Sequence, residues 1–156
     1  AGSKRPDRPV VAHAAVRAAV AKAAALLPGV PLFAGGKSFG GRMTSQAQAA
    51  SALPGVAGLV FLGFPLHPAG KPSDERAAHL FDVRVPMLFV QGTRDALAEP
   101  TLMRALVEKL GRRATLLEIE GGDHSFAVPA AAKRATSDVL GEIADAFAAW
   151  VTKAAA

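Results

Sequence analysis

One serine, set between two glycines, is the first candidate for chemistry in this sequence. Residues 36–40 read Gly-Lys-Ser-Phe-Gly, which places Ser38 in the pattern G-x-S-x-G. An apolar run at 31–34 precedes it, and a helix-forming segment at about 42–53 follows it. In that context the serine lies on a sharp strand-to-helix turn, and the amide after it faces developing negative charge. We therefore predict Ser38 as a nucleophile and the N–H of Phe39 as an oxyanion donor.

Two nucleotide-binding loops compete for the same segment, and the spacing argues against both. Gly36-Lys37-Ser38 has the ending of a Walker A motif, but the position where that motif needs its first glycine is Pro31. The dinucleotide fingerprint G-x-G-x-x-G fails because Ser38 occupies the place of its second glycine. No cofactor is therefore expected, and no cluster of residues has the spacing of metal ligands.

An acid and a base follow two later apolar runs. Asp95 comes after the run at 86–91, and His124 comes after the run at 114–119. The carboxyl ends of parallel strands meet at one edge of a sheet, where ligands bind, and Ser38 leaves its own strand at that edge. We predict that His124 takes the proton of Ser38 and that Asp95 orients the imidazole.

A second acid, Asp123, directly precedes His124. Side chains of adjacent residues rarely converge on one point, so we favour Asp95 as the partner of the histidine. Arg42 is a cation near a helix N-terminus, where the helix dipole disfavours positive charge. We expect it to pair with a carboxylate, with contact to an anionic substrate group as the alternative.

The loop after the apolar run at 56–62 supplies candidates for substrate contact. Phe64, Leu66 and His67 follow that run at the same sheet edge and are predicted to wall an acyl pocket. Packing of this loop onto its own sheet is an equally good interpretation.

Helical and strand patterns alternate along the chain. Helices are expected at 10–27, 42–53, 99–110 and 137–151, and strands at 31–34, 56–62, 86–91 and 114–119. The run at 86–91 is continuously apolar, as for a strand buried on both faces. The last helix carries one apolar stripe, formed by Val139, Leu140, Ile143, Phe147, Trp150 and Val151. This alternation predicts an α/β fold with a mostly parallel sheet of about four strands flanked by helices.

Composition sets the remaining bounds. The 156 residues are 51% hydrophobic, enough for a single domain over 1–156, and there is no cysteine. A reducing compartment suits such a chain, so a cytoplasmic location is expected. The net charge of +5 comes from scattered basic residues without interleaved aromatic residues, which argues against nucleic acid. No apolar run approaches the roughly 20 residues of a membrane span, and no membrane association is expected.

The block at 35–42, Gly-Gly-Lys-Ser-Phe-Gly-Gly-Arg, resembles the α/β-hydrolase superfamily. Within that superfamily it looks most like the dienelactone-hydrolase-like branch, in particular small hydrolases related to a testis-expressed protein. The order Ser38, Asp95, His124 is the family order. The resemblance implies ester, thioester or lactone hydrolysis of a small acyl substrate, and it matches the four strands to the last four of the family.

Family members have further strands before the nucleophile strand, and the loop after the third strand supplies a second oxyanion donor. This sequence shows no counterpart of them, so it resembles the C-terminal part of the family fold. The strand at 31–34 would then have a bare edge, which a missing N-terminal segment or a second copy of the chain would cover. The alternative function is a catalytically impaired fragment or scaffold that binds partners through this edge.

Overall fold

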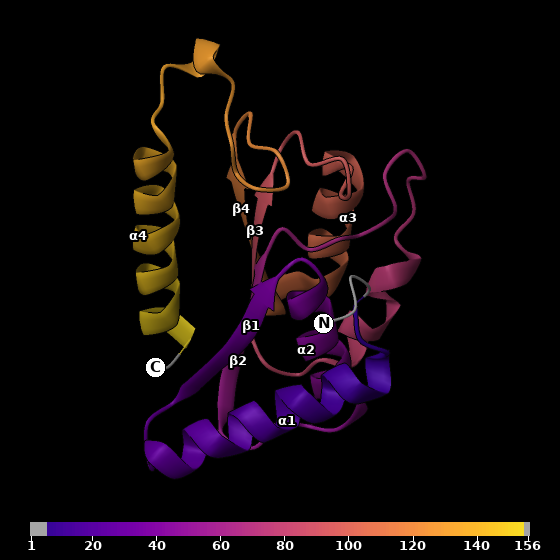
Figure 1. Cartoon of the computed structure of the whole chain (residues 1–156), viewed down its shortest axis with the longest axis vertical. Helices are drawn as coiled ribbons and strands as arrows, with labels where there is room; N and C mark the ends of the chain where they lie inside the picture. Colours follow the sequence, from indigo (N-terminus) through magenta and orange to yellow (C-terminus); the bar gives the residue numbers. More distant parts are fainter. Residues whose placement is uncertain (1–5, 155–156) are drawn as a thin grey trace, which may run out of the picture.

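Four strands lie side by side in chain order β1–β2–β3–β4, and each neighbouring pair is parallel (Figure 1). The computed structural model describes residues 6–154. The strands are β1 Leu32–Lys37, β2 Val56–Leu62, β3 Met87–Gly92 and β4 Ala114–Ile119. Every residue of β3 is buried, as its continuous apolar run predicted. The expected α/β class with a parallel sheet is confirmed.

Helices cover both faces of this sheet (Figure 1). One side carries α1 Pro9–Leu26, α2 Phe39–Ala50, α3 Pro100–Leu110 and the 3₁₀ segment η1 Glu75–Asp82. The other side carries α4 Thr136–Ala154. Two short 3₁₀ turns, η2 Gly111–Arg113 and η3 Ala130–Ala132, complete the described elements. A parallel sheet needs such cover because both of its faces are apolar.

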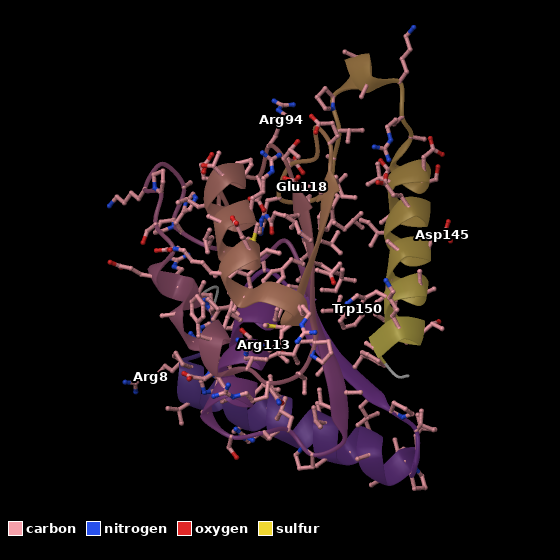
Figure 2. The ribbon with its side chains drawn as sticks, turned by 180° about the vertical axis from the view of Figure 1, so that it is seen from behind. Arg8, Arg94, Arg113, Glu118, Asp145 and Trp150 are labelled. Atoms are coloured by element: carbon pink, nitrogen blue, oxygen red, sulfur yellow. The ribbon has the colours of Figure 1, made fainter. Side chains whose placement is uncertain are left out.

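Each layer encloses its own apolar core. Under α2, α3 and η1, the rings of Phe61, Phe64 and Phe89 pack with centroids 4.8–5.9 Å apart. Under α4, Trp150 points toward the sheet (Figure 2) and packs edge-on against Phe33 at 5.5 Å. Burial of these large side chains is the main force that fixes the strands, and hence the sheet edge that carries the candidate residues.

The apolar stripe of α4, predicted from the sequence, is only partly covered. Val139 and Trp150 are buried, whereas Leu140 is 56% exposed and Phe147 is 38% exposed. Leu140 and Phe147 line an apolar hollow of about 300 Å³ with Phe33 and neighbouring residues of the sheet. Part of this helix therefore faces a space that the described residues do not fill.

The strand before Ser38 and the helix after it have bounds that differ from the predicted ones. β1 continues through the glycines to Lys37, because pairing with β2 in register up to Leu62 holds this segment extended. α2 starts at Phe39, directly after Ser38, and not near residue 42. Strand and helix are therefore separated by a single residue.

Helix α1 differs from the sequence expectation about membranes. By length and composition, its 18 residues with a mean hydropathy of 1.3 could cross a membrane, and it is the one such helix among residues 6–154. Here α1 packs on α2 and β1. Arg17 fastens it by donating hydrogen bonds to the carbonyls of Ala47 at 2.6 Å and Ser51 at 3.0 Å.

A half-buried histidine makes the stability of this layer depend on pH. His79 on η1 is hydrogen bonded through Nε2 to Ser45 Oγ of α2 at 2.7 Å. Burial, and next the positive charge of Arg42, lower the pKa of His79 from 6.5 to about 4. The folded state therefore binds a proton less readily than the unfolded chain. The contribution of His79 to the free energy of unfolding is complete above about pH 6.5 and is lost as the pH falls toward 4.

Urea unfolding at several pH values measures this effect. A shift of this size corresponds to about 3 kcal/mol, which solvent screening of the partly exposed ring reduces to about 1–2 kcal/mol. We expect His79→Gln to remove that part of the pH dependence between 6.5 and 4. An unchanged slope in this variant would show that other groups cause the acid sensitivity.

Candidate active site

Ser38 occupies a strained turn between β1 and α2. Its φ of 51° and ψ of −119° lie in a region that residues with a side chain rarely adopt. Such a conformation costs about 1–3 kcal/mol and persists only where its surroundings impose it. The N–H of Ser38 donates to the carbonyl of Leu62 at 3.0 Å, which ties the turn to the end of β2. The G-x-S-x-G segment thus has the geometry expected of a nucleophile elbow.

The glycine directly after the pattern is required by the close approach of helix and strand. A Cβ on Gly41 would lie 2.6 Å from the carbonyl oxygen of Gly36, closer than atoms can approach. The absence of that side chain lets the first turn of α2 pass over the end of β1. The glycines around Ser38 therefore provide space for the close contact of helix and strand, in addition to backbone flexibility.

His124 lies beside the serine although 86 residues separate them. Its Nε2 is 2.9 Å from Ser38 Oγ. The imidazole is partly exposed, and Gly63 lies against it, where a Cβ would come within 3.4 Å of the ring. The His124 loop, defined here as residues 120–127, follows β4 and thus meets Ser38 at the carboxyl edge of the sheet, as predicted.

Asp95 is on the opposite side of the same imidazole. His124 Nδ1 is 2.8 Å from Asp95 Oδ2, and the carboxylate has no exposed surface. Both oxygens have further donors: the Gln91 side-chain amide bonds Oδ2 at 2.5 Å, and the N–H of Leu97 bonds Oδ1 at 2.8 Å. A buried carboxylate with this many donors is held in one orientation.

Gln91 was not identified from the sequence. It is a buried polar residue near the end of the otherwise apolar strand β3, four residues before Asp95. A polar side chain inside an apolar strand is a signal that could have indicated it, because a buried amide requires a hydrogen-bonding partner.

Asp123, the alternative acid, bonds its own loop. Its Oδ1 accepts hydrogen bonds from the N–H groups of Ser125 at 2.7 Å and Ala127 at 3.0 Å. The carbonyl of Asp123 accepts a further bond from Phe126. Asp123 therefore builds the turn that carries His124, while Asp95 is the carboxylate bonded to the imidazole.

Phe39 lies at the first position of α2, where the N–H has no carbonyl one turn earlier to bond. That amide is directly after Ser38, as an oxyanion donor must be. Arg42 does not have the carboxylate partner that we expected among the described residues. Its guanidinium lies 5.9 Å from the Phe39 ring, and its Nε is buried with no hydrogen-bond partner in the described chain. Burial, and next Arg76, lower the pKa of Arg42.

The three residues predicted to wall an acyl pocket are buried. Phe64 and Leu66 have no exposed surface, and Phe64 packs in the aromatic core. Nε2 of His67 accepts a hydrogen bond from the N–H of Glu99 at 2.9 Å, and Nδ1 is hydrogen bonded to the carbonyl of Pro68. Leu66 and His67 border a hollow of about 290 Å³, which Phe64 does not. Packing of this loop, the second interpretation, therefore accounts for Phe64.

Another hollow comes closer to the elbow. The apolar hollow of about 300 Å³ described above includes Gly36, two residues before Ser38, together with Leu62 at the end of β2 and Val90 on β3. No group of three or more His, Cys, Asp or Glu residues that could hold a metal occurs between residues 6 and 154.

Parallel strands, a serine elbow, and a histidine and an aspartate at the same edge define the α/β-hydrolase class of fold. Comparison with known proteins agrees with this class. An alpha/beta hydrolase domain model matches residues 1–152, and the chain belongs to this family.

Solved structures with the same fold include several hydrolases. An alpha-beta serine hydrolase homologue from Coxiella burnetii is 20% identical with a TM-score of 0.63, over 79% of this chain and 55% of that one. A serine hydrolase without a lid from Xanthomonas campestris is 28% identical with a TM-score of 0.58, over 81% and 52%. The esterase domain of a Rhodothermus marinus protein is 15% identical with a TM-score of 0.67, over 90% and 68%. The chain spans about half the length of the first two structures.

Proposed function

We propose that this protein is a serine hydrolase of small acyl substrates, in which Ser38 is the nucleophile, His124 the general base and Asp95 the residue that orients the base. The observation that carries the proposal is the unbroken series of hydrogen bonds from Ser38 Oγ through the imidazole to the buried carboxylate, at 2.9 and 2.8 Å. Both distances are within hydrogen-bond reach, which proton transfer from Ser38 to His124 and orientation of the imidazole by Asp95 require.

The reaction follows from the positions of the protons. With its proton on Nδ1 donated to Asp95, His124 presents the Nε2 lone pair to the hydroxyl of Ser38. Attack of Oγ on the acyl carbon forms a carbon–oxygen bond while the hydroxyl proton passes to Nε2. His124 then protonates the leaving alcohol or thiol, and the bond to that group breaks. Water repeats the sequence on the acyl-serine and releases the acid.

The N–H of Phe39 supports this chemistry at the oxyanion. It follows the nucleophile directly and starts α2, so the partial positive charge of the helix N-terminus adds to its own dipole. We propose that a second donor comes from polypeptide beyond the described residues or from a second copy of the chain.

The substrate class we propose is an ester, thioester or lactone. The match to the alpha/beta hydrolase family and the esterase named among the similar structures support this class. Within the family, the Gly-Gly-Lys-Ser-Phe-Gly-Gly-Arg block supports assignment to the dienelactone-hydrolase-like branch. The acyl group would reach Ser38 from the open carboxyl edge of the sheet.

A second candidate function is partner binding without turnover. The observation that favours it is the free edge of β1, which pairs only with β2 among the described strands. Unpaired backbone groups along such an edge readily accept another strand. A scaffold of this kind would keep the Ser38 elbow but would not need the reactivity of its hydroxyl.

A fluorophosphonate probe separates the two functions, because it reacts only with an activated serine. We expect stoichiometric labelling of the wild type and none of Ser38→Ala, read by intact mass. Ser51→Ala, at the exposed C-terminal end of α2, is the matched control and should label as the wild type does. Absence of labelling in a folded wild type would favour the scaffold, and labelling of Ser38→Ala would place the nucleophile elsewhere.

A further inference from the structure

We propose that Lys37 is a positioning residue that holds the His124 loop against the nucleophile strand. The inference rests on the proposed function, since it concerns how His124 is kept beside Ser38. Lys37 is the first of the two variable residues of the G-x-S-x-G pattern, and nothing in the hydrolysis described above requires a lysine at that place.

The contact joins two segments that are distant in sequence. Lys37 Nζ donates to the backbone carbonyl of His124 at 2.6 Å, across 87 residues. Among residues 6–154, it is the one side chain hydrogen bonded to the main chain of His124. The ammonium charge strengthens the bond to a neutral carbonyl. Because Lys37 directly precedes Ser38 in the chain, this bond couples the base and the nucleophile through their backbones as well as through their side chains.

A second contact of the same ammonium engages the loop two residues further on. Nζ lies 5.3 Å from the centre of the Phe126 ring, in range of a cation–π interaction. Phe126 is 7% exposed, and its φ of 65° is unfavourable for a phenylalanine. The backbone of the loop is therefore held in a conformation that it would not adopt without support, and Lys37 touches it on both sides of Ser125.

The other anchors of the loop lie on its far side. Gly122 accepts from the N–H of Arg94 at 2.8 Å, and Gly121 donates to Thr93 Oγ1 at 2.8 Å. A Cβ on Gly92 would lie 2.2 Å from the Gly122 carbonyl oxygen, so β3 and the loop are in close backbone contact. These contacts join the start of the loop to β3 and leave Lys37 as its link to β1.

The consequence is a division of roles around one imidazole. Asp95 fixes the orientation of the imidazole ring, whereas Lys37 fixes the position of the His124 backbone relative to Ser38. Misplacement by about 1 Å in a catalytic group can lower a rate by about 100-fold. The bond is solvent-exposed, so its loss should change global stability little while it changes the rate.

Three variants test the assignment. Lys37→Met keeps the length of the side chain but removes the donor, Lys37→Arg keeps a cationic donor, and Lys22→Met removes an exposed lysine on α1 as the matched control. We expect Lys37→Met to slow fluorophosphonate labelling of Ser38, and kcat on p-nitrophenyl acetate, by roughly 10- to 100-fold with KM within about twofold. Lys37→Arg should recover most of the loss, and Lys22→Met should match the wild type.

Hydrogen exchange over residues 120–127 gives a readout that does not need activity. Lys37→Met should exchange faster in this loop than the wild type, whereas Lys22→Met should not. Unchanged labelling and unchanged exchange in Lys37→Met would overturn the proposal, and so would an arginine variant no better than methionine. If the wild type is not labelled but loop exchange responds to Lys37→Met, the proposed hydrolase function fails while the tether stands.

Discussion

Replacement of Asp95 by asparagine is expected to lower the rate of Ser38 labelling and of ester hydrolysis by about 10⁴-fold, the loss seen for the equivalent change in a serine protease. The reason lies in the donors around the carboxylate. Gln91, Leu97 and His124 all donate to its two oxygens. An asparagine has a single acceptor oxygen, so one of its two orientations turns an amide N–H toward His124.

In that orientation Nδ1 of His124 must accept a hydrogen bond, so the ring proton moves to Nε2, the atom that should take the proton of Ser38. The opposite orientation restores the acceptor for His124 but places the amide against the N–H of Leu97. Each choice leaves a buried donor without an acceptor, which is unfavourable.

Asp123→Asn provides the matched control for this prediction. It also removes a negative charge beside His124, but it keeps the Oδ1 acceptor that Ser125 and Ala127 need. We expect the rate of this variant to stay within an order of magnitude of the wild type. Equal losses in the two variants would mean that general electrostatics, and not the tautomer of His124, explain the effect. The comparison requires only labelling kinetics and a check of folding by circular dichroism.

The second large effect is expected from polypeptide that completes the site. A chain extended by the N-terminal strands of the family fold should turn over p-nitrophenyl esters at least roughly 100-fold faster than residues 1–156, because loss of one oxyanion donor costs about 100- to 1000-fold. The same extension should cover β1. On one side of that strand lies the apolar hollow under α4, and on the other a hollow of about 250 Å³ beside α1.

The size of both chains in solution, measured by light scattering, accompanies the rates. We expect the extended chain to be monomeric and residues 1–156 to associate through the free edge of β1. Ser38→Ala in the extended chain is the control that assigns any gain to this site. Equal and substantial activity of the two chains would contradict the missing-donor account. A second donor would then lie within these 156 residues or in a neighbouring copy.

Much of the fold could be predicted from residue patterns because each element has a local signal. Alternating apolar runs and helical stripes indicated four strands and four helices in the right order. The end of β1 could not be placed this way. Gly35 and Gly36 favour a turn, yet in the structure they pair with Val60 and Phe61, an interaction that depends on a strand 25 residues later.

The candidate site was predicted in part for the same reason. Ser38, Asp95 and His124 each follow an apolar strand, and the geometry of parallel sheets then places them at one edge. Their mutual hydrogen bonds could not be derived from that rule, because they depend on loop backbones such as the one that Asp123 shapes. The contact of Lys37 joins positions 87 residues apart, a pairing that no local pattern encodes. The burial of Phe64 likewise depends on how its loop folds back on the sheet.

The sequential order β1–β2–β3–β4 has a consequence for the protein as it is being synthesised. Translation delivers the serine first, the aspartate next and the histidine last. The strained turn at Ser38 can pair with β2 early, but its hydroxyl has no base until β4 and the loop after it have left the ribosome. A nascent or prematurely terminated chain would thus carry the serine in an unreactive form. Under the proposed function, reactivity toward acyl groups would arise only after His124 has been added, so the growing chain would be protected from its own chemistry.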